Sequence, residues 1–322
     1  MRATPPTLTG PGLIETIHQE MVVNLLLAYP YCYQMARLAV VGVGRIGGEV
    51  AYLASSMGIA GELVLYDSAP ELLKAQVLDL QHTGLATDIT TDKREIRDAD
   101  ICICSAGLPR NPSVRTRADL LEANSAAVRE CAALLKGFNG IVITVTNPMD
   151  ANNYLLCKRT GISRERCIGF GGQLDSARFA LALHNRGITG FSFVLGEHGE
   201  HQVPVFSTHS REIPIPLREE ILTELQGASM DVIKGKGGTV FGPALHIAHL
   251  ARMVLTDARE LVICSSVLEG EYSISGCSLG VPVRIGKDGI QSLEEWQLDR
   301  WEQEKMNEAG AFVTELCKRA VS

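Results

Sequence analysis

Short apolar segments alternate with longer amphipathic segments through the first half of the chain. The apolar runs are four or five residues long, are rich in Val, Ile and Leu, and occur at 38–41, 62–66, 101–104 and 141–145. Segments with a helical spacing of apolar residues lie between them, at 44–57, 70–82 and 119–137. Runs of this length are typical of buried strands. Their alternation with helices predicts an α/β fold with a Rossmann-type, doubly wound parallel sheet and helices on both faces.

The second half of the chain has a less regular order. Helical periodicity covers 217–236, 239–261 and about 298–321. Strand-like runs lie within 262–285, around a turn at 272–277. A mixed α/β domain is therefore predicted after the parallel sheet.

A glycine-rich turn follows the first predicted strand and opens the first predicted helix. It reads Gly42-Val43-Gly44-Arg45-Ile46-Gly47, with the spacing G-x-G-x-x-G. The first glycine permits the tight turn, the second lets a pyrophosphate approach the backbone because it has no Cβ, and the third allows close helix–strand packing. The helix N-terminus offers free N–H groups and a partial positive charge to the phosphates. Together with its flanking elements, the turn predicts a dinucleotide-binding site rather than an ordinary βαβ turn.

An acidic residue ends the second predicted strand. Asp67 lies 67 − 47 = 20 residues after the last glycine of the turn. From that position a carboxylate can accept hydrogen bonds from the adenosine ribose hydroxyls. Because a carboxylate there would repel a 2′-phosphate, the sequence favours NAD over NADP as the cofactor.

Composition and charge narrow the class of protein. The chain has 322 residues, of which 46% are hydrophobic and 21% charged; this is typical of a soluble globular protein with one large or two ordinary domains. A net charge of −7 gives no reason to expect nucleic acid as a partner. The longest apolar run near the start, 25–28, is too short to span a bilayer. Nine cysteines without a C-x-x-C motif favour reduced, buried thiols in a cytoplasmic protein.

Residues 1–34 differ from the rest of the chain. Prolines and glycines in 1–12 predict irregular structure, and 13–27 has the spacing of a short amphipathic helix. The segment lacks the basic start and the cleavage site of a secretory signal. Two interpretations remain: an arm that contacts another subunit, or an addition upstream of a native start at Met35, directly before the first strand.

Two polar segments follow strands of the first half, at the edge where doubly wound sheets bind ligands. Residues 105–120 contain three arginines, Arg110, Arg115 and Arg117. A solvated basic loop is one interpretation, but guanidinium groups beside a cofactor cleft also suit a carboxylate substrate, which arginine binds bidentately. Asn147, after the fourth strand, is either a turn residue or a donor to a substrate oxygen that helps to seat the nicotinamide ring.

Two further segments resemble signature sequences of the lactate/malate dehydrogenase family. They are Gly171-Gly172-Gln173-Leu174-Asp175-Ser176-Ala177-Arg178-Phe179 and Leu195-Gly196-Glu197-His198-Gly199-Glu200-His201. Supporting motifs occur in the family's order: A-G-L-P-R at 106–110, T-R-A-D-L at 116–120, T-N-P at 146–148, K-G-G-T at 236–239, F-G-P-A at 241–244 and G-V-P-V at 280–283. The resemblance runs from Met35 to the C-terminus and is closest to archaeal, lactate-dehydrogenase-like malate dehydrogenases.

The resemblance implies reversible hydride transfer between malate or oxaloacetate and NAD(H). It places His198 as the proton donor and acceptor, a role that suits a group titrating near neutrality. It places Asp175 as the partner of His198, since a carboxylate fixes the tautomer and stabilises the imidazolium. Arg178 is assigned to the substrate C1 carboxylate, although an i, i+3 salt bridge with Asp175 is the alternative. Arg117 is assigned to the reacting carbonyl.

Arg110 is the residue that the resemblance assigns to substrate choice. In the family this position meets the substituent on C3 of the substrate, and a cation there suits the second carboxylate of oxaloacetate; lactate dehydrogenases carry glutamine. The segment from Arg110 to Arg117 spans 117 − 110 = 7 positions, one more than is usual in the family. Arg117 fits the T-R-A-D-L motif, and Arg115 is a possible substitute for it.

The resemblance also implies the cofactor contacts and the domain boundaries. The cofactor contacts are Gly42, Gly44, Arg45, Ile46, Gly47, Asp67, Asn124, Val145 and Asn147. An NAD-binding Rossmann domain is expected at 35–171 and a substrate-binding domain at 172–322. A cis peptide bond is expected between Asn147 and Pro148. The chain is expected to form a homodimer or homotetramer and to serve the tricarboxylic acid cycle.

Three alternatives to this function stay open at the level of sequence. His198 and His201 could form a zinc pair, but Gly199 between them argues against a helix and no H-E-x-x-H motif is present, so no metal is expected. A lactate or other 2-hydroxy-acid dehydrogenase is the nearest enzymatic rival. A catalytically inactive NAD-binding homologue is the rival from another class.

Overall fold

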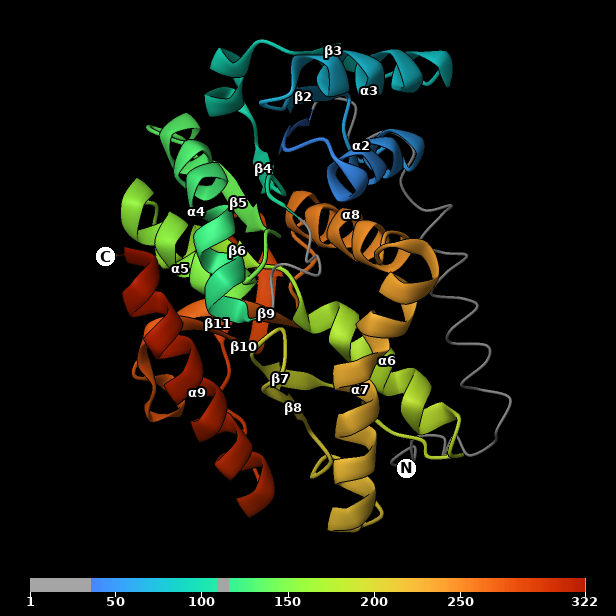
Figure 1. Cartoon of the computed structure of the whole chain (residues 1–322), viewed down its shortest axis with the longest axis vertical. Helices are drawn as coiled ribbons and strands as arrows, with labels where there is room; N and C mark the ends of the chain where they lie inside the picture. The colour runs from blue at the N-terminus through green and yellow to red at the C-terminus, as the bar shows by residue number, and fades with distance from the viewer. Residues whose placement is uncertain (1–35, 109–115, 322) are drawn as a thin grey trace, which may run out of the picture.

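A single continuous sheet runs through the molecule in the computed structural model, which describes residues 36–108 and 116–321. The described chain forms an 11-stranded sheet in the order β3-β2-β1-β4-β5-β6-β9-β10-β7-β8, with β11 paired to β10 (Figure 1). The predicted segment 13–27 and the loop arginines Arg110 and Arg115 lie outside the described residues.

The first six strands of this order are parallel and come from residues 37–169. They are β1 (Arg37–Val41), β2 (Glu62–Tyr66), β3 (Asp88–Thr90), β4 (Ile101–Cys104), β5 (Ile141–Thr144) and β6 (Cys167–Gly169). From β1 the chain adds β2 and β3 on one side and then β4, β5 and β6 on the other. This change of side between β1 and β4 is the topological switch point of a doubly wound sheet, and the loops next to it bind ligands. The predicted Rossmann-type sheet is confirmed. Two of its strands, β3 and β6, were not predicted because three residues are too few to show a periodicity.

The remaining strands are antiparallel and come from the second half. They are β7 (Val194–Gly196), β8 (Gln202–Pro204), β9 (Glu260–Glu269), β10 (Ser275–Gly286) and β11 (Gly289–Leu293). This group joins the parallel group through one residue pair, Gly169 of β6 with Ser265 of β9. The mixed α/β character predicted for the second half is therefore confirmed, and its strands extend the same sheet.

Helices cover both faces of the sheet (Figure 1). On one side lie α4 (Arg117–Leu134), α5 (Met149–Thr160) and α9 (Arg300–Val321). On the other lie α2 (Arg45–Ser56), α6 (Gly172–His184), α7 (Ile215–Lys236) and α8 (Phe241–Leu255), while α3 (Pro70–His82) lies beside the outer strands. Short 3₁₀ turns occur at Lys93–Asp98, Arg164–Arg166 and Glu271–Ser273.

Two helix boundaries differ from the predictions for local reasons. The helix predicted over 239–261 ends at Leu255, because Asp257 and Arg259 take positive φ angles of 50° and 54° that no α-helix contains. The helix predicted from 119 begins at Arg117. Its N-cap, Thr116, accepts a hydrogen bond from the Asp119 N–H, and the Asp119 side chain accepts one from the Thr116 N–H, which is a complete capping box.

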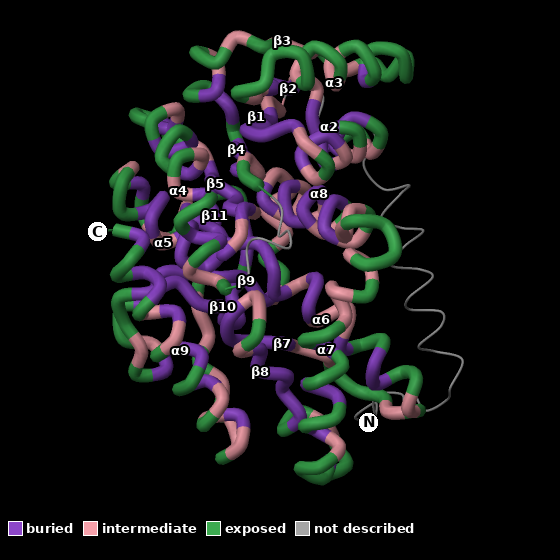
Figure 2. Tube along the Cα trace, in the orientation of Figure 1, coloured by how far each residue is buried: buried purple, intermediate pink, exposed green. Residues whose placement is uncertain are grey.

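The core follows the sheet, as the buried strands in Figure 2 show. β1, β4 and β5 consist almost wholly of buried residues, as expected for parallel strands covered on both faces. The helices bury one side and expose the other. Within residues 36–108 and 116–321, none of the helices is both long enough and apolar enough to cross a membrane.

Candidate active site

The glycine turn connects β1 to α2 at the switch point, and its geometry explains the three glycines. Gly42 has φ +91°, and a Cβ on it would overlap the backbone of Ala106 in the loop after β4. A Cβ on Gly47 would overlap the carbonyl of Gly42. Gly44 has open space where its Cβ would stand, and the first turn of α2 has no side-chain cap and no acidic residue. The turn thus leaves backbone N–H groups free for phosphate oxygens.

Asp67 stands beside this turn at the end of β2. Its carboxylate accepts hydrogen bonds from the N–H of Val43 and the N–H of Ala69, each at 2.9 Å. A carboxylate has about four acceptor sites, so two remain for hydroxyl donors such as those of a ribose. The two backbone bonds fix the direction of the side chain before any ligand arrives. The predicted ribose contact of Asp67 stays a prediction.

The other predicted cofactor residues lie around the same edge. Arg45 donates from Nη1 to the carbonyl of Gly237 at 3.0 Å, which joins the glycine turn to the α7–α8 connection. Asn124 is buried and holds two loops together: it accepts from the N–H of Leu108 at 2.6 Å and donates to the carbonyl of Asn147 at 2.8 Å. Its side chain therefore positions the loops after β4 and β5. Val145 and Ile46 lie at this edge and pack against the core.

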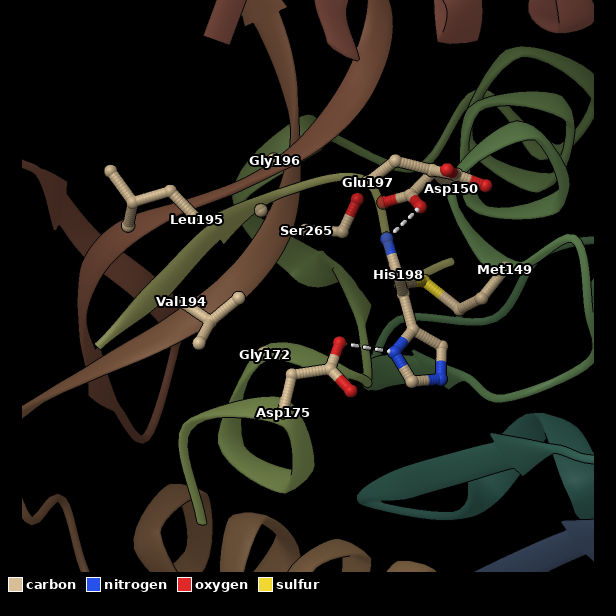
Figure 3. Close-up of a pocket in the computed structure, with 11 residues that line it drawn as sticks. Met149, Asp150, Gly172, Asp175, Val194, Leu195, Gly196, Glu197, His198 and Ser265 are labelled. Atoms are coloured by element: carbon tan, nitrogen blue, oxygen red, sulfur yellow. Dashed lines mark hydrogen bonds and ion pairs between the residues drawn. The ribbon is translucent and has the colours of Figure 1, made fainter. Parts of the chain in front are cut away.

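The centre of the site is a histidine–carboxylate pair. His198 lies in the turn after β7, and Asp175 lies in the first turn of α6. Nδ1 of His198 is 2.7 Å from Oδ2 of Asp175, and the second ring nitrogen points away from that carboxylate (Figure 3). A Cβ on Gly171 would overlap the imidazole ring, so the glycine at the start of α6 makes room for the histidine. Asp175 also accepts a hydrogen bond from Arg178 Nη1 at 3.0 Å, the i, i+3 pair considered in the sequence.

The charges of this pair stabilise each other. Burial alone would lower the pKa of His198, but the charge of Asp175 and its hydrogen bond outweigh burial, so the pKa of His198 is raised. Burial opposes ionisation of Asp175 as well, yet the pKa of Asp175 is lowered, because His198 and Arg178 both favour its anion. The His198 side chain keeps 17% of its surface exposed, so a small substrate can reach it.

Arg117 brings a second guanidinium to His198 from the start of α4. Its Nη2 donates to the carbonyl of His198 at 3.0 Å, and its Nη1 donates to Oδ1 of Asn147 at 3.4 Å. Asn147 directly precedes a cis peptide bond to Pro148, as predicted. The fold thus gathers Arg117, Asn147 and His198, which are far apart in the sequence, at one point. Arg110 lies outside the described residues.

Glu197 holds Arg117 in place and was missed in the sequence. Only 2% of the Glu197 side chain is exposed, and its Oε1 lies 3.3 Å from Nε of Arg117. Its Oε2 accepts from the N–H groups of Glu200 and His201, each at 2.9 Å. Burial opposes its ionisation, but His201 and Arg117 outweigh burial and lower the pKa of Glu197. A Cβ on Gly199 would overlap the Arg117 guanidinium, so the acid and the glycine next to His198 both serve this arginine.

Asp150 is the second acid that sequence reasoning missed. It lies in the first turn of α5, is 3% exposed, and accepts a hydrogen bond from the backbone N–H of His198 at 2.9 Å. Burial raises the pKa of Asp150 to about 6. The signal available in the sequence was an acid directly after the T-N-P-M segment, at a strand end that points to the ligand edge.

The zinc alternative is not supported by the geometry of the two histidines. His198 is directed to Asp175, whereas His201 lies 3.2 Å from Glu197 and stacks on the ring of Phe312. No group of three or more potential metal ligands occurs among the residues that the structure describes. All eight cysteines in the described parts of the chain are free and buried, as the sequence suggested.

Comparisons with known proteins agree with the fold. Residues 36–169 match the family described as lactate/malate dehydrogenase, NAD binding domain, and residues 173–321 match the lactate/malate dehydrogenase, alpha/beta C-terminal domain. The chain belongs to the lactate/malate dehydrogenase family. The resemblance stated from the sequence is thereby confirmed, and with it NAD as the cofactor of the family's first domain.

Individual members of the family align over nearly their whole length. The malate dehydrogenase of Natronomonas pharaonis is 37% identical, over 87% of this chain and 98% of its own. The L-lactate dehydrogenase of Geobacillus sp. (strain WCH70) is 29% identical, over 88% and 97%. The solved malate dehydrogenase from Archaeoglobus fulgidus in complex with NADH has a TM-score of 0.81 and 29% identity, over 89% and 100%.

Proposed function

We propose that the chain is an NAD-dependent malate dehydrogenase that interconverts malate and oxaloacetate. The observation that carries this proposal is the 2.7 Å contact between His198 and Asp175 with two further cations close by: Arg117 on the carbonyl of His198 and Arg178 on Asp175. A proton carrier with cations on either side suits an anionic 2-hydroxy acid. The malate dehydrogenase relatives support the dicarboxylate substrate.

Each residue has a separate task in the proposed reaction. His198 takes the proton of the malate hydroxyl through its free ring nitrogen and returns it to the ketone oxygen in the reverse direction. Asp175 keeps that nitrogen unprotonated in the resting tautomer and stabilises the imidazolium. Arg117 donates to the reacting oxygen as negative charge develops on it. Arg178 binds the C1 carboxylate, and Asn147 orients the substrate oxygen.

The glycine turn fits NAD by its open backbone at Gly44, its uncapped helix start and the preset carboxylate of Asp67. Bound NAD would accept the hydride that the malate carbon loses. The residues of this chain hold the dinucleotide at the sheet edge, next to the loops that carry Arg117 and Asn147, and they exclude a 2′-phosphate through Asp67.

Substrate choice is proposed to rest on Arg110, the residue that the family resemblance assigns to the C3 substituent of the substrate. The test follows NADH absorbance at fixed enzyme with oxaloacetate, with pyruvate and with neither. Preferential oxidation of NADH with oxaloacetate is expected. Preference for pyruvate would indicate a lactate dehydrogenase, and no turnover with either, with NADH still bound, would indicate an inactive homologue. The His198→Asn variant serves as the catalytically impaired control.

The compartment and the assembly of the enzyme are proposed from the chemistry of its side chains. Free, buried thiols suit a reducing compartment such as the cytoplasm, where the reaction would serve the tricarboxylic acid cycle.

A homodimer or homotetramer is supported by large apolar side chains exposed on α2 and α8, namely Tyr52, Phe241 and Leu245. Light scattering after size-exclusion chromatography measures the assembly. The NAD-binding unit is proposed to cover 35–171 and the substrate unit 172–322.

A further inference from the structure

Asp150 approaches His198 from the side opposite the catalytic pair. In Figure 3 the histidine lies between two carboxylates, with Asp175 at its ring and Asp150 at its backbone N–H. The two acids come from different halves of the chain, Asp150 from α5 and Asp175 from α6. Asp150 is not needed as the partner of the imidazole, which Asp175 already occupies.

We propose that Asp150 is a second carboxylate behind the proton-carrying histidine, a positioning residue that anchors the His198 backbone and whose negative charge increases the proton affinity of the imidazole. The inference deepens the proposed function and rests on His198 as the proton carrier. It assigns to Asp150 an effect on the proton transfer without contact to substrate or cofactor.

The geometry argues against an ordinary acid at a helix N-terminus. Such an acid usually faces solvent and interacts with its own helix, whereas Asp150 is 3% exposed and its Oδ2 binds a backbone N–H that lies 48 residues further along the chain. Its other oxygen, Oδ1, is buried without a hydrogen-bond partner among the described residues, and the nearby Ser265 hydroxyl, which favours the Asp150 anion, is 2.7 Å from the Ser278 hydroxyl. A buried carboxylate oxygen that is not fully hydrogen-bonded is unfavourable for stability, so retaining an acid here calls for a reason other than packing.

The charge of Asp150 acts on His198 and is itself close to its titration. Because burial raises the pKa of Asp150 to about 6, with the nearby Glu197 carboxylate adding to the rise and the Ser265 hydroxyl opposing it, the group is ionised only above that pH. Ionised Asp150 raises the pKa of His198, and this effect adds to the larger one of Asp175. The histidine therefore holds its proton more firmly when Asp150 is charged.

Other charged and titratable groups surround this pair on every side. Asp175 and Arg178 face it from α6, and Arg117 and Glu197 from the start of α4 and the turn after β7. Ser265 on β9 is neutral.

Two buried thiols, Cys277 on β10 and Cys317 on α9, also feel the charge of Asp150. Burial raises the pKa of Cys277 to about 11 and raises the pKa of Cys317 further above its ordinary value, so both thiols stay neutral at working pH. Asp150, unlike these thiols, changes charge near neutrality.

The test is the isosteric variant Asp150→Asn, in which the amide oxygen still accepts from the His198 N–H. Oxaloacetate reduction needs protonated His198 and malate oxidation needs neutral His198. Losing the Asp150 charge should move both limbs toward lower pH. Reduction on the alkaline side should fall on the order of tenfold, since a buried charge at close range commonly moves a pKa by about one unit. Glu302→Gln, a buried carboxylate that binds Phe206, Ser207 and Asp299, is the matched control and should leave both limbs in place.

A second variant keeps the test decisive if Asp150→Asn does not fold. Ser265→Ala removes the hydroxyl that favours the ionised form of Asp150, so it should give a smaller shift in the same direction. If neither the limbs nor the titration of the His198 ring moves in the variants that fold, the tuning role is wrong and Asp150 is only a backbone anchor.

Nuclear magnetic resonance of ring-labelled histidine separates this inference from the proposed function. The His198 ring should titrate at lower pH in Asp150→Asn than in the parent chain. A ring titration that moves while both rate limbs stay fixed would uphold the tuning and remove His198 from its role as proton carrier. A ring titration that does not move would overturn the tuning itself.

Discussion

Arg178 donates a hydrogen bond to Asp175 at 3.0 Å, on the carboxylate oxygen that His198 does not use. The acid therefore connects the group proposed to carry the proton with the group proposed to hold the substrate. A guanidinium has five N–H donors, so Arg178 can bind a substrate carboxylate while keeping this bond. The pairing considered in the sequence as an alternative to substrate binding is thus compatible with it.

Replacing Arg178 by lysine should weaken substrate binding. Lysine keeps the charge but cannot bind a carboxylate bidentately. Loss of one charge-assisted hydrogen bond corresponds to about 1.5–3 kcal/mol, or roughly a ten- to hundredfold decrease in kcat/KM for oxaloacetate. Steady-state kinetics measure this, and NADH binding by fluorescence should be unchanged. An unchanged KM would show that Arg178 serves Asp175 alone.

Removing either member of the His198–Asp175 pair should slow turnover. We expect His198→Asn to reduce kcat by about 10²–10⁴-fold, the range typical of lost acid–base catalysis. Asp175→Asn should approach the same loss because the amide favours the wrong tautomer. NADH affinity should persist in both variants. A variant that turns over at near-parental rate would rule out the assignment of that residue.

The two directions of the reaction should show opposite pH dependence. Because the pKa of His198 lies above its ordinary value of 6.5, the imidazolium persists above pH 6.5 and oxaloacetate reduction should hold there before falling as pH rises further. Malate oxidation needs neutral imidazole and should rise over the same interval. Asp175→Asn should move both limbs to lower pH, as measured by kcat/KM between pH 5 and 10. Limbs centred below pH 6.5 in the parent chain would contradict the raised pKa.

Asp67 should determine the choice of coenzyme. In Asp67→Ser the negative charge that repels a 2′-phosphate is lost, so the ratio of kcat/KM for NADH to that for NADPH should fall by an order of magnitude or so. The serine also removes an acceptor for the N–H groups of Val43 and Ala69. Thermal denaturation should accompany the kinetics to confirm folding. If a folded variant keeps the parental ratio of kcat/KM for NADH to that for NADPH, Asp67 does not select the coenzyme.

Arg110 should select the dicarboxylate. In Arg110→Gln we expect kcat/KM to fall for oxaloacetate and to rise for pyruvate, because losing a charged contact costs about 2–5 kcal/mol and an unpaired guanidinium no longer penalises the methyl group. The double variant Arg110→Gln, Arg115→Ala tests substitution by the neighbouring arginine. If both variants retain the full preference for oxaloacetate, another residue selects the substrate.

The sheet was predictable where its strands were long enough to carry a pattern. The runs 38–41 and 101–104 were apparent because parallel strands are apolar on both faces, and the glycine turn was apparent because its spacing has a backbone reason. β3 and β6 were not predicted, since strands of three residues are too short to show a hydrophobic periodicity. The end of α8 escaped as well, because the positive φ angles at Asp257 and Arg259 have no sequence signature in non-glycine residues.

The residues of the site could be predicted from the sequence better than the contacts between them. His198 and Asp175 were named from their motifs, and the structure places them in contact. The approach of Arg117 to Asn147 could not be read from the sequence, because it depends on how α4 meets the end of β5. Glu197 and Asp150 were overlooked because each lies beside a residue with a more obvious role, and burial, which distinguishes them from surface acids, is a property of the fold alone.

The sheet joins its parallel and antiparallel groups through one residue pair, Gly169 with Ser265, but helices pack across the same boundary, α5 against α9 and α2 against α8, within one hydrophobic core. Arg117, Asn147 and Asp150 come from one side of this boundary, and His198, Asp175 and Arg178 from the other. Because the two sides share their core, in a denaturant titration we expect turnover and the circular dichroism of the secondary structure to be lost together. Catalytic activity would then report the cooperative unfolding of both sides at once.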